Sequence, residues 1–329
     1  MTKKEKAIYK IGRKNKNGYR FSIFSKNQKK WINYVLVFLI FSVCIFTLEK
    51  SEIVSLNQIK NSLGAIDGVN PVDSNFAVYY LDVGQSDCTI IICDNEVLML
   101  DCGTLNQLNT IRQSLLSLNI KTIDYMVISH QHDDHMGSAT EIIKDYEVEN
   151  LIMPKLTQSN NVTTKTYNVL INTINENNIN KIPAQNCDNF KVGDAVVEIL
   201  SPSVQSNNLN NMSVVLKITY GETEFLFQGD SETKIENDLI LSDFDIDVDV
   251  LKIGHHGSKT STSDKFIDAT SPDIAVISSG YANNYGHPNG AILDRLENND
   301  IKTYITALDG NVVLSSDGKN IAIHNENHY

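Results

Sequence analysis

Several patterns that identify common enzyme chemistries are missing from this 329-residue sequence. It has no Walker-type glycine loop, and Ser231 has no nucleophile-elbow motif around it, which argues against an NTPase and against serine catalysis. None of the five cysteines forms a C-x-x-C pair, so we do not expect a zinc site built from thiolates. Cys88, Cys93 and Cys102 fall in strand-like runs typical of core residues, and disulfide pairing among them or with Cys187 stays open. The length accommodates one large α/β domain or two small ones.

Histidine is scarce and unevenly distributed, with eight residues in the chain and none between positions 136 and 254. The stretch "SHQHDDHMGS", residues 129–138, holds three of the eight together with two aspartates. The full set is His130, His132, His135, His255, His256, His287, His324 and His328. Imidazoles beside carboxylates are a typical ligand set for Zn²⁺ or a similar transition metal. We therefore expect a metal site in this stretch, the alternative being a solvated polar loop.

The N-terminal segment differs in composition from the rest. Residues 1–30 carry eleven Lys and Arg against one acid, a net charge of +10, and the uncharged run "WINYVLVFLIFSVCIFTL" follows at 31–48. This run is long enough to span a bilayer, and its basic flank predicts a cytoplasmic N-terminus. No A-x-A-like cleavage site follows, which favours an uncleaved anchor. We expect a single-pass protein of the cell membrane with a basic cytoplasmic tail (1–30), a transmembrane anchor (31–48), a polar stalk (49–75) and an extracellular domain (76–329).

The charge outside the basic tail is strongly acidic. The whole chain carries −12, so removing the +10 of the tail leaves −22 on residues 31–329. Such a charge disfavours binding of long polyanions unless positive charge is concentrated locally. Bound divalent metal would supply some of that positive charge.

Residues 76–329 alternate short apolar runs with helical patterns. Strand-like runs at 76–84, 87–94 and 96–103 precede a helical pattern, and "IDYMVISH" is a further strand that ends on His130. A hairpin is expected over 213–230 with its turn at 220–223, and helices and strands alternate beyond it. This order predicts an α/β fold with a two-sheet core, helices on the outer faces and two similar halves.

The expected strand ends place the candidate ligands. Because side chains alternate along a strand, His130 and His132 point to the same side. The chain then turns into a helix near Gly137, which brings Asp134 and His135 back toward the same point.

Two distant segments carry further candidates at strand ends. "FLFQGDSE" places Asp230 at the exit of an apolar strand, and "LKIGHHGS" places His255 and His256 at the exit of another. Strand ends that converge from different parts of a chain can assemble a metal centre on a rigid sheet.

These motifs occur in the order H-x-H-x-D-H, then G-D, then H-H-G-S, an order that resembles the metallo-β-lactamase superfamily. More narrowly, the extracellular hydrolase domain of the ComEC/Rec2 competence proteins is similar to "LDVGQSD" (81–87), "LMLDCG", "SHQHDDHMGS", "NNMSVVLKITYGETEFLFQGD", "LKIGHHGSKTS" and "NNYGHP". The resemblance runs from about residue 76 to the C-terminus. It implies an αββα metallo-β-lactamase sandwich with two divalent metal ions, Zn or Mn, between the sheets.

The resemblance also implies a role for each matching residue. The implied metal ligands are His130 and His132 for the first ion, Asp134, His135 and His256 for the second, and Asp230 as the bridge. His256 is preferred over His255 because the ligand of related T-H-x-S nucleases directly precedes the x-Ser pair, but the choice between them stays open. His255 would then steady the developing charge, and Asp134 could also orient the nucleophile. His287, in "YGHP", would contact the substrate or act as a general acid.

Other residues would support the ligands from behind. Asp101 resembles the superfamily's acid that orients a ligand imidazole. For Asp82, Gln85 and Asp87, a purely structural role in turns and strand edges is equally open. Many superfamily members have another histidine shortly before the hairpin, where this chain reads "NLNNMS". Asn210 or Asn211, of which we favour Asn211, would then approach by carbonyl oxygen, and an oxygen-rich first site would tolerate Mn²⁺ better.

Together these inferences predict a membrane-anchored, extracellular, metal-dependent hydrolase. The expected substrate is a phosphodiester, with single-stranded DNA suggested by the resemblance to DNA-uptake proteins. A single membrane span cannot form their DNA channel, and the acidic outer domain disfavours a tight grip on long nucleic acid. A small phosphodiester or a lactone stays open as the substrate, and so does a non-catalytic metal-binding surface module.

Overall fold

The computed structural model of the protein describes residues 68–156, 162, 164–203 and 206–324. The predicted basic tail (1–30) and transmembrane anchor (31–48) lie outside these residues, as does most of the predicted stalk (49–75). Within the described part of the chain, no helix combines the length and the apolar composition that crossing a bilayer requires.

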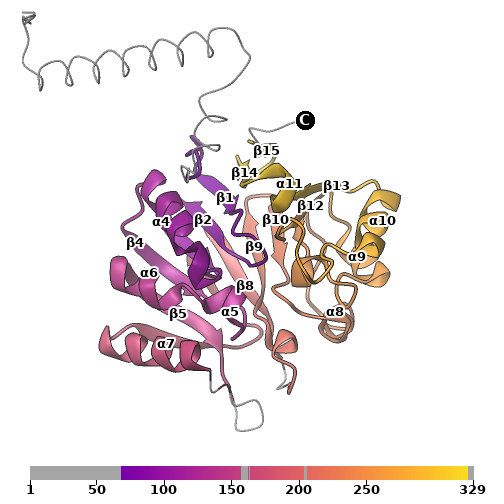
Figure 1. The fold of residues 1–329 in the computed structure, drawn as a ribbon. Helices are drawn as coiled ribbons and strands as arrows, with labels where there is room; N and C mark the ends of the chain where they lie inside the picture. Colours follow the sequence, from indigo (N-terminus) through magenta and orange to yellow (C-terminus); the bar gives the residue numbers. More distant parts are fainter. Residues whose placement is uncertain (1–67, 157–161, 163, 204–205, 325–329) are drawn as a thin grey trace, which may run out of the picture. The chain divides into compact units, whose positions relative to one another are not determined.

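Two sheets form the centre of the described domain (Figure 1). The first has eight strands in the order β15-β14-β1-β2-β3-β4-β5-β6, and the second has seven in the order β13-β12-β11-β10-β9-β8-β7. The first sheet comprises β1 (Phe76–Tyr80), β2 (Thr89–Cys93), β3 (Glu96–Leu100), β4 (Thr122–Val127), β5 (Glu147–Pro154), β6 (Asn180–Ala184), β14 (Val312–Ser316) and β15 (Ile321–Ile323). The second comprises β7 (Asn189–Val192), β8 (Ala195–Ser201), β9 (Val215–Tyr220), β10 (Thr223–Phe227), β11 (Val250–Lys252), β12 (Ile274–Ile277) and β13 (Lys302–Ile305).

Each sheet joins an antiparallel part to a parallel part. Strands β1, β2 and β3 pair antiparallel, and β3 to β6 continue in parallel. In the second sheet, β7 to β10 pair antiparallel and β10 to β13 in parallel. The shared pattern agrees with the expected two similar halves. Parallel strands of one sheet end at the same edge, so the residues that follow β10 and β11 lie together at one edge of the second sheet. The residues that follow β4 lie at an edge of the first sheet and can meet them between the two sheets.

Helices cover the outer face of each sheet, so the predicted αββα layering is confirmed (Figure 1). The helices are η1 (Leu105–Gln107), α4 (Leu108–Ser117), α5 (Asp133–Met136), α6 (Ala139–Asp145), α7 (Lys165–Glu176), η3 (Asn210–Met212), α8 (Thr233–Ile240), η4 (Gly254–Gly257), α9 (Asp264–Thr270), α10 (Gly290–Asn298) and α11 (Thr306–Asp309). Apolar residues of α4, α6 and α7 pack on the first sheet, and those of α8, α9 and α10 pack on the second. Each of these six helices buries one apolar face against a sheet.

The core between the sheets is apolar and rich in aromatic residues. Phe76 of β1 packs on Phe225 of β10 with ring centroids 5.2 Å apart, and Tyr80 packs on Phe227 at 5.9 Å. These four side chains are fully buried, and each aromatic pair contributes about 0.5–1.5 kcal/mol beyond the burial of its area. The contacts hold the two sheets together beneath the edge that carries the metal-site candidates.

Two local expectations can be compared with the structure. The hairpin turns between β9 and β10 as expected, where Gly221 has a φ of +63°. The strand whose exit was expected to carry His255 and His256 ends at Lys252, and the chain then enters the tight turn η4. His255 and His256 have φ angles of 50° and 54° there, in the left-handed region that non-glycine residues seldom adopt. Such backbone strain is typical of functional sites.

Candidate metal centre

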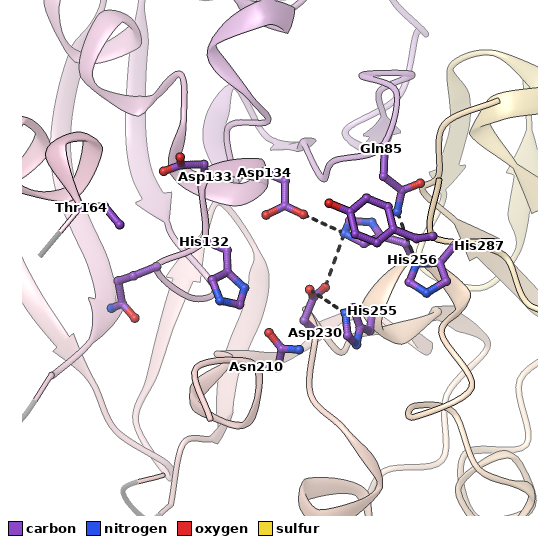
Figure 2. A pocket seen from close by; sticks show the side chains of 12 residues that line it. Gln85, His132, Asp133, Asp134, Thr164, Asn210, Asp230, His255, His256 and His287 are labelled. Carbon is purple, nitrogen blue, oxygen red and sulfur yellow. Dashed lines mark hydrogen bonds and ion pairs between the residues drawn. The ribbon is translucent and has the colours of Figure 1, made fainter. Parts of the chain in front are cut away.

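A pocket of about 410 Å³ opens at the sheet edge where β4, β10 and β11 end (Figure 2). Its lining residues are Gln85, Gln131, His132, Asp133, Asp134, Thr164, Asn210, Asp230, His255, His256, Tyr285 and His287. They come from both sheets and from loops far apart in sequence, as expected for a site at converging strand ends.

The H-x-H-x-D-H segment is shaped by a short helix directly after β4. His132 precedes α5 with extended backbone angles, and its carbonyl accepts hydrogen bonds from the backbone N–H groups of His135 and Met136. Gly137 follows α5, where a Cβ atom would collide with the carbonyl oxygens of Asp133 and Gly103. The glycine therefore lets this helix lie directly on the loop after β3, which carries Asp101.

Asp101 holds His135 in one orientation. Its Oδ2 atom lies 2.8 Å from His135 Nδ1 and accepts a hydrogen bond from the hydroxyl of Ser129, and its Oδ1 atom accepts one from the backbone N–H of Ser129. His135 Nδ1 is thereby turned away from the pocket, and Nε2 points to the centre. Burial alone would lower the pKa of His135, but the nearby carboxylates of Asp230 and Asp101 raise it well above its usual value.

His130 and His132 present a pair of ring nitrogens. His130 Nε2 lies 2.9 Å from His132 Nδ1 and 3.6 Å from Asp230 Oδ2. The other ring nitrogen of His130 lies 3.1 Å from the hydroxyl of Ser129 and 3.5 Å from that of Ser213. Burial, reinforced by the charge of His135, holds the pKa of His130 well below its usual value. A neutral imidazole is the form that binds a metal.

A second group surrounds Asp134. His256 Nε2 lies 3.3 Å from Asp134 Oδ2, and His135 Nε2 lies 3.9 Å from the same oxygen. Burial raises the pKa of Asp134, but the hydrogen bond to His256 and the charge of His135 outweigh it and lower the pKa to about 2. Asp134 is therefore ionised at neutral pH, with its side chain 33% exposed toward the pocket.

Asp230 stands between the two groups. Its Oδ2 atom lies 3.4 Å from His135 Nε2 and 3.6 Å from His130 Nε2, and its Oδ1 atom lies 3.9 Å from His256 Nε2. The backbone N–H of Asp230 donates to Ser213 Oγ at 3.0 Å, which fixes the carboxylate at the end of β10. One carboxylate thus faces both sets of imidazoles, as a bridging ligand would.

The turn η4 gives its two histidines different environments. His256 Nδ1 lies 3.0 Å from the carbonyl oxygen of Ser278 and 3.2 Å from Asp87 Oδ1, so Nε2 faces the centre. Burial lowers the pKa of His256, but the charges of Asp230 and Asp87 outweigh it and raise the pKa to about 10. His255 lines the pocket with Nε2 3.7 Å from Asp230 Oδ2, and its Nδ1 lies 3.3 Å from Thr260 Oγ1.

The donor atoms fit divalent metal ions. His130, His135 and Asp230 form one group, and Asp134, His135 and His256 another, in which all ligand atoms lie within 4.8 Å of one another. Buried polar atoms are almost always hydrogen-bonded, yet His135 Nε2 and Asp230 Oδ1 are buried with no hydrogen-bond partner among the residues that the structure describes. A bound cation would satisfy both atoms, and this set of imidazoles and carboxylates suits Zn²⁺ or Mn²⁺.

The residues expected behind the ligands differ in position. Asp87 contacts His256, and Gln85 lines the pocket. Asp82 is exposed and accepts a hydrogen bond from the backbone N–H of Gly84, as a turn residue does. His324 lies away from the pocket and contacts Ser315.

The two asparagines before β9 have different surroundings. The backbone N–H of Glu232 donates to Asn211 Oδ1 at 3.1 Å, and Asn211 Nδ2 donates to Glu232 Oε2 at 3.3 Å. Both polar atoms of the Asn211 side chain therefore bind Glu232 and do not face the pocket. Asn210 lines the pocket instead, and its Oδ1 atom is buried without a hydrogen-bond partner. The structure therefore favours Asn210 over the expected Asn211 as the residue that faces the centre.

Some pocket residues were not identified from the sequence. Gln131 and Asp133 lie inside the H-x-H-x-D-H segment, where attention falls on the ligands, and Tyr285 precedes His287 in "NNYGHP". Thr164 has no sequence signal, because it reaches the pocket only through the fold. The cysteines that stayed open, Cys88, Cys93, Cys102 and Cys187, are all free.

The chain is similar to known proteins in sequence and in fold. The sequence profile of the "Metallo-beta-lactamase superfamily" matches residues 81–168. The chain is 31% identical to "ComE operon protein 3" of Bacillus subtilis (strain 168), over 60% of this chain and 25% of that protein. It is 30% identical to "Recombination protein 2" of Haemophilus influenzae, over 70% of this chain and 28% of that protein. The chain thus spans only about a quarter to a third of the length of these relatives.

Among solved structures, a mutant of the CmlA β-hydroxylase has a similar fold. The TM-score is 0.50 at 14% sequence identity, with 83% of this chain and 59% of that chain covered. At this identity the similarity concerns the fold alone.

Proposed function

Because the chain belongs to the metallo-β-lactamase superfamily, with a domain of the competence-protein type, we propose that it is a metal-dependent hydrolase of phosphodiesters. One observation carries the proposal. Imidazoles and carboxylates from both sheets converge on the bridging position of Asp230, where buried nitrogen and oxygen atoms lack hydrogen-bond partners. Buried polar atoms without hydrogen-bond partners would destabilise a purely structural core, whereas a divalent metal centre needs such free nitrogen and oxygen atoms as ligands.

Some of the pocket residues would bind the cations, and Asp134 would also take part in proton transfer. Divalent cations, when bound, supply Lewis acidity toward a phosphoryl oxygen and lower the pKa of water. His130 and His132 would hold one cation, Asp134, His135 and His256 the other, and Asp230 both. Asp134, ionised and open to the pocket, is placed to accept a proton from the attacking water.

His287 is suited to donate a hydrogen bond. Gln85 Oε1 accepts from the backbone N–H of Gly280 at 3.0 Å, which leaves Gln85 Nε2 to donate toward His287 Nδ1 at 3.4 Å. The proton of the imidazole is thereby placed on Nε2. Burial, with His255 and His256 nearby, lowers the pKa of His287, so the ring is neutral at pH 7. His287 would thus stabilise charge on the ester oxygens, beside His255, instead of losing a proton.

Charge supports an anionic ester handled by metal. Among the residues that the structure describes, no lysine or arginine lines the pocket, so the attraction for a phosphate has to come from bound cations. The net charge of −22 on residues 31–329 disfavours a long polyanion, which favours short phosphodiesters or single-stranded ends over duplex DNA. A lactone needs no such compensation and serves as the contrasting substrate.

We place this activity at the outer face of the cell membrane. The support comes from the sequence, in which the basic segment 1–30 precedes the apolar run 31–48. Protease added to intact cells should remove the domain while sparing the N-terminal tail. Protection of the domain until the cells are lysed would contradict this location.

The test of the activity uses the purified full chain in detergent, loaded with Mn²⁺ or Zn²⁺. We expect hydrolysis of bis-p-nitrophenyl phosphate and of short single-stranded DNA that stops with chelator and in Asp134→Ala. Asp238→Ala removes an exposed carboxylate on α8, away from the pocket, and should keep full activity. Turnover of a lactone but of no phosphodiester would contradict the substrate class. Absence of turnover with every ester, despite bound metal, would point to a non-catalytic metal-binding module.

A further inference from the structure

One large aromatic side chain stands at the mouth of the pocket. Tyr285 is 74% exposed and lines the cavity, where it is the one tyrosine among the described lining residues, whose other side chains are polar. Exposing a tyrosine ring to water forgoes the stabilisation that burying its apolar surface would give. A fold that holds such a ring at the mouth of its active-site pocket provides a contact surface for something that enters it.

The loop that carries Tyr285 is held in a defined shape. Asn283 Oδ1 accepts from the backbone N–H groups of Tyr285 and His287, both at 3.1 Å. Its Nδ2 atom donates to the carbonyl oxygens of Gly280, at 2.8 Å, and of His287. Gln85, from the other sheet, accepts from the backbone N–H of Gly280. The tyrosine is therefore presented by a fixed loop, which reduces the entropy lost when a ligand binds.

The ring of Tyr285 continues a series of parallel rings that begins at the metal site. Tyr285 and His287 have centroids 5.8 Å apart at an interplanar angle of 26°. His287 and His256 have centroids 6.4 Å apart at 24°. Figure 2 shows His256 and His287 together with Gln85 on one side of Asp230, away from Thr164 and Asp133. A planar group that enters beside the metal site on this side can continue the series.

We propose that Tyr285 is a stacking platform for a nucleobase on the nucleotide next to the scissile bond. The proposal rests on the proposed function and names its substrate class, a nucleotide-containing phosphodiester. Stacking of a base on an aromatic ring stabilises binding and tolerates any sequence, because every base has a π-face. A quaternary ammonium group such as choline is recognised by a cage of aromatic rings, whereas a single tyrosine is found among the described residues that line this pocket.

The described lining residues include no lysine or arginine, and this limits how the pocket can recognise a long single strand. Proteins that follow a long single strand combine stacking with a positively charged groove, and the pocket provides only the stacking part. The base nearest to the scissile bond therefore contributes most of the recognition. Affinity should rise little once a substrate is a few nucleotides long.

The experiment compares a short oligothymidylate with an abasic tetrahydrofuran oligomer of the same length and charge. Both are given to the Mn²⁺-loaded full chain in detergent, and KM and kcat are measured by separation of the products. Wild type should favour the thymidylate in KM by roughly tenfold, the equivalent of one stacked base. Tyr285→Ala should remove this preference by raising KM for the thymidylate while kcat is retained, and Tyr285→Phe should keep it. Tyr281→Ala removes an equally exposed tyrosine that does not line the pocket, and it should behave like wild type.

An undiminished base preference in Tyr285→Ala would overturn the proposal. An effect of Tyr285→Ala on glycerophosphocholine, with none on thymidylate, would overturn it in favour of a cation site. Equilibrium binding of the same two oligomers to the metal-loaded protein, in which bound cations supply the attraction for phosphate, separates this proposal from the proposed function. If no phosphodiester is hydrolysed but a base preference in binding is lost in Tyr285→Ala, the stacking site stands and the hydrolase assignment fails.

Discussion

A buried ion pair joins the two sheets directly behind the metal centre. Lys252, at the end of β11, lies with Nζ 2.9 Å from Oδ2 of Asp87, which precedes β2 in the other sheet. The two side chains are 3% and 7% exposed. Oδ1 of Asp87 lies 3.2 Å from His256 Nδ1, and its backbone N–H donates to the carbonyl oxygen of Asp134. We predict that Lys252→Met lowers both the stability of the domain and its affinity for metal.

The magnitude follows from the burial of the pair. Removing one partner leaves an uncompensated charge in the interior, which costs about 3–5 kcal/mol. For a domain of this size, that loss lowers Tm by roughly 6–20 °C. Burial raises the pKa of Asp87, but the charges of Lys252 and His256 outweigh it and hold this pKa below its usual value. In Lys252→Met the pKa of Asp87 rises, because the neighbouring positive charge is gone. In the double variant Asp87→Asn, Lys252→Met both charges of the pair are removed, so it should be more stable than Lys252→Met.

The effect on metal affinity distinguishes the Asp87–Lys252 ion pair from a buried ion pair that only stabilises the fold. Asp87→Asn should weaken metal binding by about 10–100-fold, as loss of a carboxylate behind a ligand histidine commonly does, and Lys252→Met should weaken it in the same direction. Lys217→Met is the matched control, since Lys217 is also 3% exposed and lies 3.0 Å from Glu224, away from the pocket. It should lose stability but keep its metal affinity.

The assay combines thermal unfolding, followed by circular dichroism in chelator, with metal affinity from competition with a chromophoric chelator. Wild-type metal affinity in both Lys252→Met and Asp87→Asn would refute the reasoning. An equal loss of affinity in Lys217→Met would refute it too, because the effect would then be general destabilisation.

Three further predictions concern the same centre. Gly137→Ala should destabilise the domain by about 1–3 kcal/mol, measured by urea unfolding, because the added methyl group collides with two backbone carbonyl oxygens; unchanged stability would contradict the close packing of α5. Asp101→Asn should weaken metal binding by about 10–100-fold, measured by chelator competition, because it no longer accepts the proton of His135 Nδ1. In chelator, the raised pKa of His256 contributes stability that is complete below its ordinary pKa of about 6.5 and is lost as the pH rises through about 10. Wild-type Tm should therefore fall over this range more than that of His256→Gln, and parallel profiles would contradict the assigned pKa.

Local sequence patterns predicted much of the fold. Strand β4 and the turn at Gly221 follow from apolar alternation and turn chemistry, which are properties of neighbouring residues, although β4 ends at Val127 and not at the expected His130. The layering of helices on two sheets follows from the order of these elements. The tight turn at His255 and His256 was not predicted, because it forms where the backbone N–H groups of Gly254 and His255 donate to Gln228 and Gly229 of another strand end.

By itself, the sequence determined which segments carry metal-capable side chains, because clustering and spacing are visible along the chain. Only the tertiary structure decided how those side chains are supported. Asp87 meets Lys252 across 165 positions, and Gln85 meets His287 across 202. Such contacts leave no periodic trace, because they arise only when the two sheets pack face to face and bring the loops at their ends together. The same packing decided that Asn210 faces the pocket while its neighbour pairs with Glu232.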